Sequence, residues 1–238
     1  MMTQTFTLDI NSLDGPLGQR VYTALRNKIL TMAYEPGFVL RKGALCEQLG
    51  VSRSPVTEAL NKLSSDGLVD IIPQSATRVS RFSMFELRQE SFLREAVEIA
   101  AIAKVAQERT EDQMTKLSRN LKMQNLLVED KDFQGFFEAD LEFHDMVLSF
   151  TGFPKVAITA GQMLLQLNRA RMLILPERGR PAEAVAEHHA ILAGIKARDS
   201  DAARAAMTLH LRQLMTRLEP LERQHPEYFR PNQEEAPR

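Results

Sequence analysis

Four residues with metal-binding side chains recur at helical spacing in the C-terminal part of the sequence. Asp140 and His144 are four residues apart, so on a helix they project from one face. His188 and His210 each lie among aliphatic residues that would form the inward stripe of a later helix. One carboxylate and three imidazoles suit a divalent transition metal of the zinc, nickel or manganese class. The pattern predicts a metal site, provided that the helices bring the four side chains together.

A second interpretation of these residues requires no metal. A histidine on an apolar helix face is often a core residue, and metal ligands are rare. Against this, an aspartate in an apolar stripe is costly to bury unless it is paired. The presence of all four residues favours the metal, but periodicity leaves open whether they converge.

Arginines in the same region could bind an anionic small molecule. Arg94 stands one helical turn before Glu98, and a guanidinium facing inward would bind a carboxylate through two parallel hydrogen bonds. The alternative is an Arg–Glu pair on the surface or at a dimer interface. Arg169 and Arg171 are further candidates for binding an effector.

A second group of residues near the N-terminus could contact DNA. Arg53 lies at the start of a predicted helix and could bind a guanine through two hydrogen bonds, while Thr57 could touch a base or a phosphate. Arg41 and Lys42 begin the preceding helix and could bind phosphates. Arg78 lies in a predicted hairpin and could reach the minor groove or the backbone. The full set is Arg41, Lys42, Arg53, Ser54, Thr57 and Arg78.

The elements that must position the DNA-contacting residues are three helices and a hairpin. Aliphatic residues recur every four positions from Leu17, and glycine or proline ends each helical segment. Ser54 and Pro55 are expected to supply the N-cap and the first position of the third helix. This order predicts a winged helix-turn-helix, whose second helix enters the major groove. The expected helices span residues 17–32, 42–49 and 54–66, and the expected strands span 68–72 and 77–81.

From Ser83 onward the sequence shows only helical periodicity. Ser83 and Glu86 form a capping-box signature that opens a long helix. The fold class is therefore mainly α, with an N-terminal winged helix-turn-helix followed by an antiparallel all-α bundle of six to seven helices. The predicted domains are 1–82, 83–225 and a flexible tail, 226–238. The expected helices of the second domain span residues 83–108, 111–130, 132–150, 154–174, 181–197 and 200–223.

The composition narrows the class of protein. The 238 residues are 44% hydrophobic and 26% charged, which is typical of a globular chain. No stretch approaches the roughly 18 apolar residues that a membrane span needs, and the first ten residues do not resemble a signal peptide. Cys46 is the single cysteine, which excludes an internal disulfide and fits a reducing compartment. We expect a cytoplasmic protein with no membrane partner.

The distribution of charge favours a nucleic-acid contact at the N-terminus only weakly. The whole chain has a net charge of −1. Residues 1–82 hold nine basic and seven acidic residues, a net charge of +2, whereas the remainder has a net charge of −3. The sign is right for an N-terminal DNA contact, but the magnitude alone decides nothing.

Residues 49–69 carry a longer and more specific signature. They read LGVSRSPVTEALNKLSSDGLV, which closely resembles the DNA-binding domain of the GntR superfamily. The resemblance implies a homodimer that binds a short palindromic operator on double-stranded DNA, commonly as a repressor. Thr57 stands where the family usually has an arginine, and Ala76 replaces the usual glycine of the wing. These departures concern the operator sequence and the wing contact rather than the fold.

The C-terminal two-thirds of the chain resembles the FCD effector domain of the FadR-like branch of that family. Metal-binding members carry Asp-x-x-x-His, a Glu-His on a later helix and a histidine on the last helix. This chain has Asp140 and His144, then Glu187-His188, then His210. The resemblance implies that these positions bind the metal and that a small organic acid acts as the effector.

Three functions remain compatible with the sequence. The favoured hypothesis is a repressor controlled by a small carboxylate effector that binds with a divalent metal. A metal-dependent hydrolase with an appended DNA-binding domain is one alternative, because three histidines and an aspartate could hold a catalytic ion with an open position. Another alternative is a constitutive DNA-binding dimer without an effector, whose helical domain serves only for dimerisation.

Overall fold

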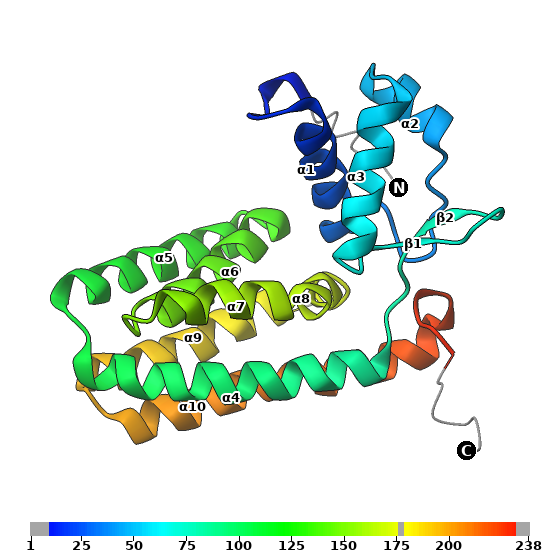
Figure 1. The fold of residues 1–238 in the computed structure, drawn as a ribbon. Coiled ribbons are helices and arrows are strands. Elements are labelled where there is room, and N and C mark those ends of the chain that lie inside the picture. Colours follow the sequence, from blue (N-terminus) through cyan, green and yellow to red (C-terminus); the bar gives the residue numbers. More distant parts are fainter. Residues whose placement is uncertain (1–9, 176–178, 232–238) are drawn as a thin grey trace. The chain divides into compact units, whose positions relative to one another are not determined.

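The computed structural model describes residues 10–175 and 179–231, which form two compact units (Figure 1). Among the described residues, one unit comprises residues 10–82 together with Pro226–Pro231, and the other comprises residues 83–175 and 179–225. Within the described residues, ten α-helices and one two-stranded sheet confirm the predicted fold class. None of the described helices combines the length and the hydropathy that crossing a membrane requires.

The N-terminal unit is built around its third helix. Val56, Leu60 and Leu63 form the expected buried stripe of this helix, and all three are fully buried where it packs against the first two helices. The second helix ends at Gly50, whose left-handed φ of 64° favours glycine. The elements are a 3₁₀ turn at Ile10–Ser12, α1 (Leu17–Leu30), α2 (Lys42–Leu49), α3 (Arg53–Ser65), β1 (Val69–Ile71) and β2 (Thr77–Val79).

The start of α3 differs from the prediction. Ser52, not Ser54, occupies the N-cap position, so the helix begins at Arg53 and Ser54 lies exposed in the first turn. Pro55 sits at the third helical position, where its missing N–H would have had no partner within the helix. The proline therefore marked the first turn correctly but not the first residue.

The wing contains an extended segment that the sequence analysis missed. β1 and β2 pair antiparallel, with Val69 opposite Val79. On the other edge of β2, the Val79 N–H donates to the Phe38 carbonyl at 2.9 Å, and the Leu40 N–H donates to the Thr77 carbonyl at 2.8 Å. Residues 37–40 thus extend the hairpin to a third, irregular edge.

Residues 226–231 pack into the N-terminal unit, whereas the sequence predicted a flexible tail from residue 226. Phe229 is only 3% exposed and lies against Phe82, with 5.8 Å between the ring centroids. The Arg230 N–H donates to the Phe82 carbonyl at 2.7 Å, and its guanidinium pairs with Asp70 on β1. Burial of a phenylalanine outweighed the prolines and charges on which the prediction relied. Residues 232–238 lie outside the described residues.

The second unit is entirely helical in its described part. α10 packs against α4 and α9, and α5 packs against α6 and α9 (Figure 1). Side chains that point inward from α6, α9 and α10 consequently meet in one core. The helices are α4 (Met84–Glu108), α5 (Glu111–Glu129), α6 (Phe133–Ser149), α7 (Pro154–Met163), α8 (Leu165–Arg171), α9 (Arg180–Ala197) and α10 (Ser200–Gln224).

The single helix predicted over residues 154–174 is broken into α7 and α8. Leu164 separates them, with φ −102° and ψ 20°. The Leu167 N–H, which a continuous helix would direct to the carbonyl four residues earlier, instead donates to the Glu90 carboxylate of α4 at 2.8 Å. Because a distant residue supplies this acceptor, periodicity within the segment could not show the break.

Candidate metal centre and DNA-contacting residues

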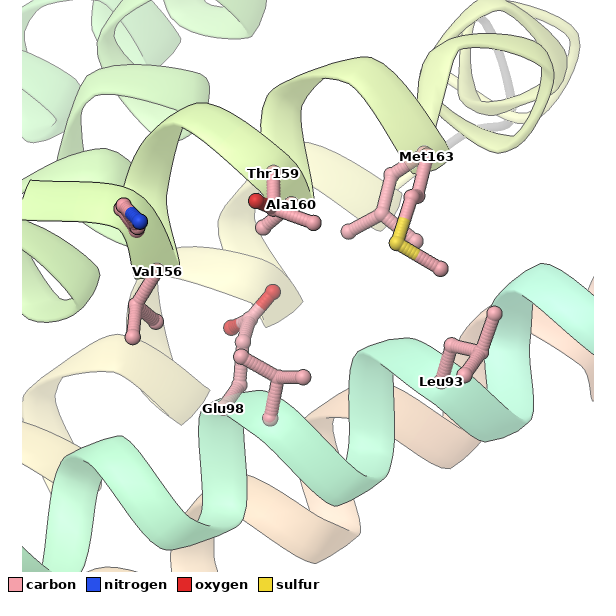
Figure 2. Close-up of a pocket in the computed structure, with 9 residues that line it drawn as sticks. Leu93, Glu98, Val156, Thr159, Ala160 and Met163 are labelled. Carbon is pink, nitrogen blue, oxygen red and sulfur yellow. The ribbon is translucent and has the colours of Figure 1, made fainter.

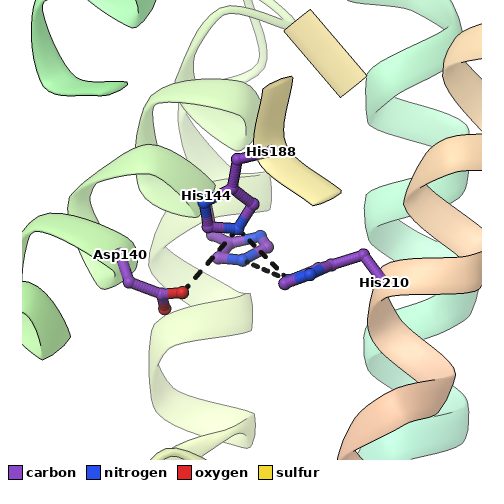
Figure 3. A group of neighbouring side chains, drawn as sticks. All are labelled: Asp140, His144, His188 and His210. Carbon is purple, nitrogen blue, oxygen red and sulfur yellow. Dashed lines mark hydrogen bonds and ion pairs between the residues drawn. The ribbon is translucent and has the colours of Figure 1, made fainter. Parts of the chain in front are cut away.

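The four predicted metal-binding residues meet in the core of the helical unit. Asp140 and His144 extend from α6, His188 from α9 and His210 from α10 (Figure 3). One ligand atom from each residue lies within 4.8 Å of the others. All four residues are buried, at most 4% exposed. The fold therefore brings together residues that are up to 70 positions apart in the chain.

The distances between the imidazoles suit a shared ion. The Nε2 atom of His210 lies 3.1 Å from Nε2 of His144 and 3.3 Å from Nε2 of His188. Two nitrogens bound to one zinc ion at about 2.0–2.1 Å lie about 2.8–3.4 Å apart, for bond angles between a right angle and the tetrahedral angle. Asp140 Oδ1 is 3.7 Å from Nε2 of His188, so a carboxylate oxygen borders the same point.

Each histidine uses its other ring nitrogen to hold a partner outside the cluster. Nδ1 of His144 lies 2.5 Å from a Glu98 carboxylate oxygen, and Nδ1 of His210 lies 2.6 Å from a Glu187 oxygen. Nδ1 of His188 lies 2.7 Å from the side-chain oxygen of Gln124. Ionised carboxylates only accept hydrogen bonds, so the two glutamates assign the proton to Nδ1.

The orientation of the Gln124 amide completes this assignment. Its nitrogen donates to Asn120 Oδ1 at 2.8 Å and to the Ala139 carbonyl at 3.3 Å, which leaves its oxygen to accept from His188. All three Nδ1 atoms thus donate, and all three Nε2 atoms direct unprotonated lone pairs at one another. A core histidine with ordinary partners would not be placed in this way. The arrangement fits a bound cation, with outer residues that fix the orientation of each ligand.

Burial keeps the imidazoles in the neutral form that binds metal. It lowers the pKa of His144, and it lowers the pKa of His188 and His210 well below the usual range, with neighbouring histidines adding to the effect in the latter two. Burial would raise the pKa of Glu98, but the charge of Arg94 and the hydrogen bonds from His144 and Arg94 hold it well below its ordinary value. Glu98 is therefore an ionised acceptor for His144.

Three arginines surround the cluster, and each pairs with one carboxylate. Arg94 Nε lies 2.7 Å from Glu98, and Arg180 makes a two-pronged contact with Glu187 at 3.0–3.2 Å. The third pair joins Arg171 to Asp140. These pairs balance one another, so a divalent ion would leave a net positive charge in the core, even counting the exposed carboxylate of Asp145. A buried charge of this kind is costly unless an anion accompanies it.

Two small cavities flank the cluster. Each has a volume of about 20 Å³, enough for about one water molecule. Arg94 and Arg171 border both cavities, and Arg180 borders one. Arg94 therefore faces inward, as the effector-binding interpretation requires, and does not form a surface pair with Glu98. Arg169, predicted with them, is also buried but borders neither cavity.

Arg180 and Gln124 also belong to the site, although the sequence did not predict them. Arg180 precedes Pro181 at the start of α9 and lies two helical turns before Glu187, so helical spacing could have placed it on the same face. Gln124 gave no such signal, because its partner His188 is 64 positions away. Only the packing of α5 against α9 brings Gln124 and His188 together.

The predicted DNA-contacting residues all lie in the N-terminal unit. Arg53 and Ser54 are exposed in the first turn of α3, and Thr57 is half-buried one turn later. Arg41 and Lys42 are exposed at the start of α2. The sixth residue, Arg78, is exposed on β2 and donates to the Gly37 carbonyl at 3.3 Å.

Comparison with known proteins places both units in one family. Residues 17–79 match the family model for bacterial regulatory proteins of the gntR family, and residues 91–213 match the model of the FCD domain. The HTH-type transcriptional repressor RspR of Escherichia coli K12 is 30% identical over 90% of this chain and 94% of its own length. A regulator from an unstable DNA locus of Streptomyces ambofaciens is 34% identical over 88% of each chain.

A solved structure confirms the fold independently. E. coli McbR/YncC superposes with a TM-score of 0.74 at 22% identity, covering 87% of this chain and 99% of that one. The relatives are transcriptional regulators rather than enzymes, which leaves the hydrolase hypothesis without support. The chain therefore belongs to the GntR family of DNA-binding transcriptional regulators, among the members that carry an FCD domain.

Proposed function

We propose that this regulator is a homodimeric repressor whose operator affinity is controlled by a small carboxylate bound together with a divalent metal ion. Asp140, His144, His188 and His210 would hold the ion, which would act as a Lewis acid toward a carboxylate oxygen. Arg94, Arg171 and Arg180 would bind and orient the rest of the anion through hydrogen bonds. Repressor activity is inferred from relatives such as RspR.

One observation carries this proposal: three buried Nε2 lone pairs and a carboxylate meet at one point. Neutral imidazoles in this arrangement repel one another without a cation, so the cluster stores an unfavourable contact that metal binding relieves. The ion then adds positive charge beside arginines whose own charges are already neutralised by paired carboxylates. An anionic effector restores neutrality, and a neutral one does not.

Chain connectivity supports a link between the metal centre and the DNA-binding unit. α4, which carries Arg94 and Glu98, begins directly after Phe82. α10, which carries His210, ends just before the segment that contains Phe229. Because Phe82 and Phe229 pack together in the N-terminal unit, a shift of α4 relative to α10 would act on one point of that unit. Control further requires that the effector bind two dimer geometries with different affinity.

Operator binding tests this function in two steps. A duplex is first selected from a random library by the wild-type protein, and affinities are then measured by fluorescence anisotropy. Arg53→Ala should lose about 1–3 kcal/mol of specific binding, the value of a two-bond base contact. Arg119→Ala, which removes an exposed arginine on α5, is the matched control and should bind as wild type. Equal affinity of both variants would remove Arg53 from the DNA-contacting set.

The second step adds zinc and then acetate, malonate or citrate. At least one of these carboxylates should weaken operator binding of the wild type by roughly tenfold, within the usual range of coupling between sites. His188→Ala should bind the operator without additives almost as tightly as wild type and should show no response to the carboxylates. A response of equal size in His188→Ala would refute control through the metal centre.

A further inference from the structure

The two cavities beside the metal cluster are too small to hold a whole organic acid. Each has a volume of about 20 Å³, which is enough for about one water molecule. A carboxylate group could replace that water between Arg94, Arg171 and the ion. The rest of the molecule needs another space, and the lining of that space decides which acids bind.

An apolar hollow between α4 and α7 adjoins one of these cavities. Its volume is about 300 Å³, at the lower end of the range for ligand pockets. Figure 2 shows Leu93 and Glu98 reaching into it from α4, with Val156 and Met163 facing them from α7. The hollow and the cavity share three lining residues, which are Glu98, Ala160 and Leu164. A single layer of side chains therefore separates the hollow from the metal centre.

Small side chains form part of this layer. Ala160 contributes one methyl group, and Gly161, which follows it and lines the cavity, has no side chain. The two oxygens of Glu98 already accept hydrogen bonds, one from Arg94 and the other from His144. Ala160 is therefore the point at which a narrow chain of methylene groups would pass from the cavity into the hollow.

The lining of the hollow favours an aliphatic group over a polar one. A hydroxyl group placed there would give up hydrogen bonds to water, and its possible new partners, Thr159 and Lys155, lie at exposed positions. A second carboxylate on the ligand would lie beside Glu98, whose negative charge would repel it. The apolar lining residues are Leu93, Val97, Val156, Ala160, Met163 and Leu164.

We infer that the effector is a monocarboxylate with an aliphatic tail, whose carboxylate binds at the metal centre and whose tail occupies the α4–α7 hollow. The inference rests on the proposed function and narrows its class of effector. The tail would cover apolar surface that water now reaches, including Met163, which is 44% exposed. Ala160 then becomes the residue that admits long acids as well as short ones.

The reverse orientation, with the carboxylate on Lys155 and the tail directed inward, explains less. Lys155 is exposed, and an ion pair at such a position contributes little to affinity. A carboxylate there would also leave the charge of the buried ion without an accompanying anion. The orientation with the carboxylate at the metal satisfies both the charge of the ion and the apolar lining of the hollow.

Titration calorimetry of the zinc-loaded full-length protein with acetate, butyrate, hexanoate and octanoate tests the inference. Each methylene group that enters the hollow should raise the affinity by roughly two- to fourfold, so hexanoate should bind at least about 15-fold more tightly than acetate. Hexanoate should bind the chelator-treated protein far more weakly, and Lys155→Ala should keep the wild-type ratio of hexanoate to acetate affinity.

The ratio of hexanoate to acetate affinity also tests the route past Ala160. Ala160→Leu should reduce this ratio to about threefold or less, because the larger side chain closes the passage. Gln162→Leu introduces the same side chain at an exposed position of α7 that lines neither space, and it should keep the wild-type ratio. Met163→Gln keeps the tests decisive if Ala160→Leu fails to fold. Its amide in the wall of the hollow should lower the ratio by roughly fourfold, the value of about one methylene group.

The outcomes separate this inference from the proposed function. Equal affinity of acetate and hexanoate for the wild type would overturn the inference and leave control by a metal-bound carboxylate intact. A wild-type ratio in both Ala160→Leu and Met163→Gln, or hexanoate binding that needs Lys155 but not zinc, would also overturn it. Failure of every acid to bind the zinc-loaded wild type would refute the proposed function as well.

Discussion

Three hydrogen-bond acceptors behind the histidines orient the ligand set that we propose. Glu98, Glu187 and Gln124 each accept a hydrogen bond from an Nδ1–H group, which aims the three Nε2 lone pairs at a common point. Without these acceptors each imidazole could reverse its tautomer and hydrogen-bond to a neighbour. The geometry of the proposed ligand set is thus fixed without an ion, which would reduce the entropic cost of binding one.

Gln124 is the acceptor whose removal changes no charge. Gln124→Leu should weaken zinc binding by about 10- to 100-fold, because His188 loses the partner that fixes its orientation. A competition titration against a chromogenic chelator measures the affinity. Gln134→Leu, at an exposed glutamine on α6, serves as the control and should retain the wild-type value. An affinity of Gln124→Leu within a factor of about two of wild type would show that the outer partner is dispensable.

At the residue scale, the sequence predicted side chains that share a helix and missed those that meet across helices. The four-residue spacing of Asp140 and His144 fixed their common face, and the structure brings His188 and His210 to them. Gln124 was invisible because its role depends on a contact 64 positions away. Arg169 was chosen by residue type alone, and it is buried in α8 without lining either small cavity.

Element boundaries were predictable where local chemistry decides them. Ser83 accepts from the Glu86 N–H at the start of α4, and Gly50 ends α2, both as expected. The break at Leu164 and the packing of Phe229 depend on residues in distant elements, Glu90 and Phe82. Periodicity within one segment contains no information about such partners, so these features could not be predicted.

Helices α6, α9 and α10 meet through buried neutral histidines. The packing of these helices should therefore be sensitive to acid. The pKa values of His188 and His210 are lowered well below 6.5 in the folded chain, whereas an unfolded chain would have the ordinary value. Below about pH 6.5 the unfolded state therefore binds more protons than the folded state. The free energy of unfolding consequently decreases as the pH is lowered. The slope is up to about 1.4 kcal/mol per pH unit for each histidine.

Urea unfolding of the chelator-treated protein at pH 7.5, 6.5 and 5.5 measures this effect. The midpoint should change little between the two higher values and should drop at pH 5.5. His188→Leu removes one of the groups, so its midpoint should fall less steeply over the same interval. Parallel curves for wild type and His188→Leu would contradict the assignment of a buried neutral imidazole to this position.

In the molecule as a whole, the predicted DNA-contacting residues and the proposed metal ligands lie in different units, and the chain connects these units at two places. The arginines and the lysine that we predict to contact DNA lie in the N-terminal unit, and the buried aspartate and histidines that we propose as metal ligands lie in the helical unit. The chain passes between the units at Phe82–Ser83 and again at His225–Pro226. A regulator needs both the separation and the connection, because each site must act alone yet influence the other.

The central claim is that the buried aspartate and three histidines bind one divalent ion. Elemental analysis by mass spectrometry, after loading with zinc, nickel or manganese and removal of the excess, tests it most directly. Wild type should retain about one ion per chain, and Asp140→Ala and His188→Ala should retain almost none while remaining helical. A wild type that retains no ion, or a His188→Ala variant that still binds one per chain, would show that these four residues do not form a metal site.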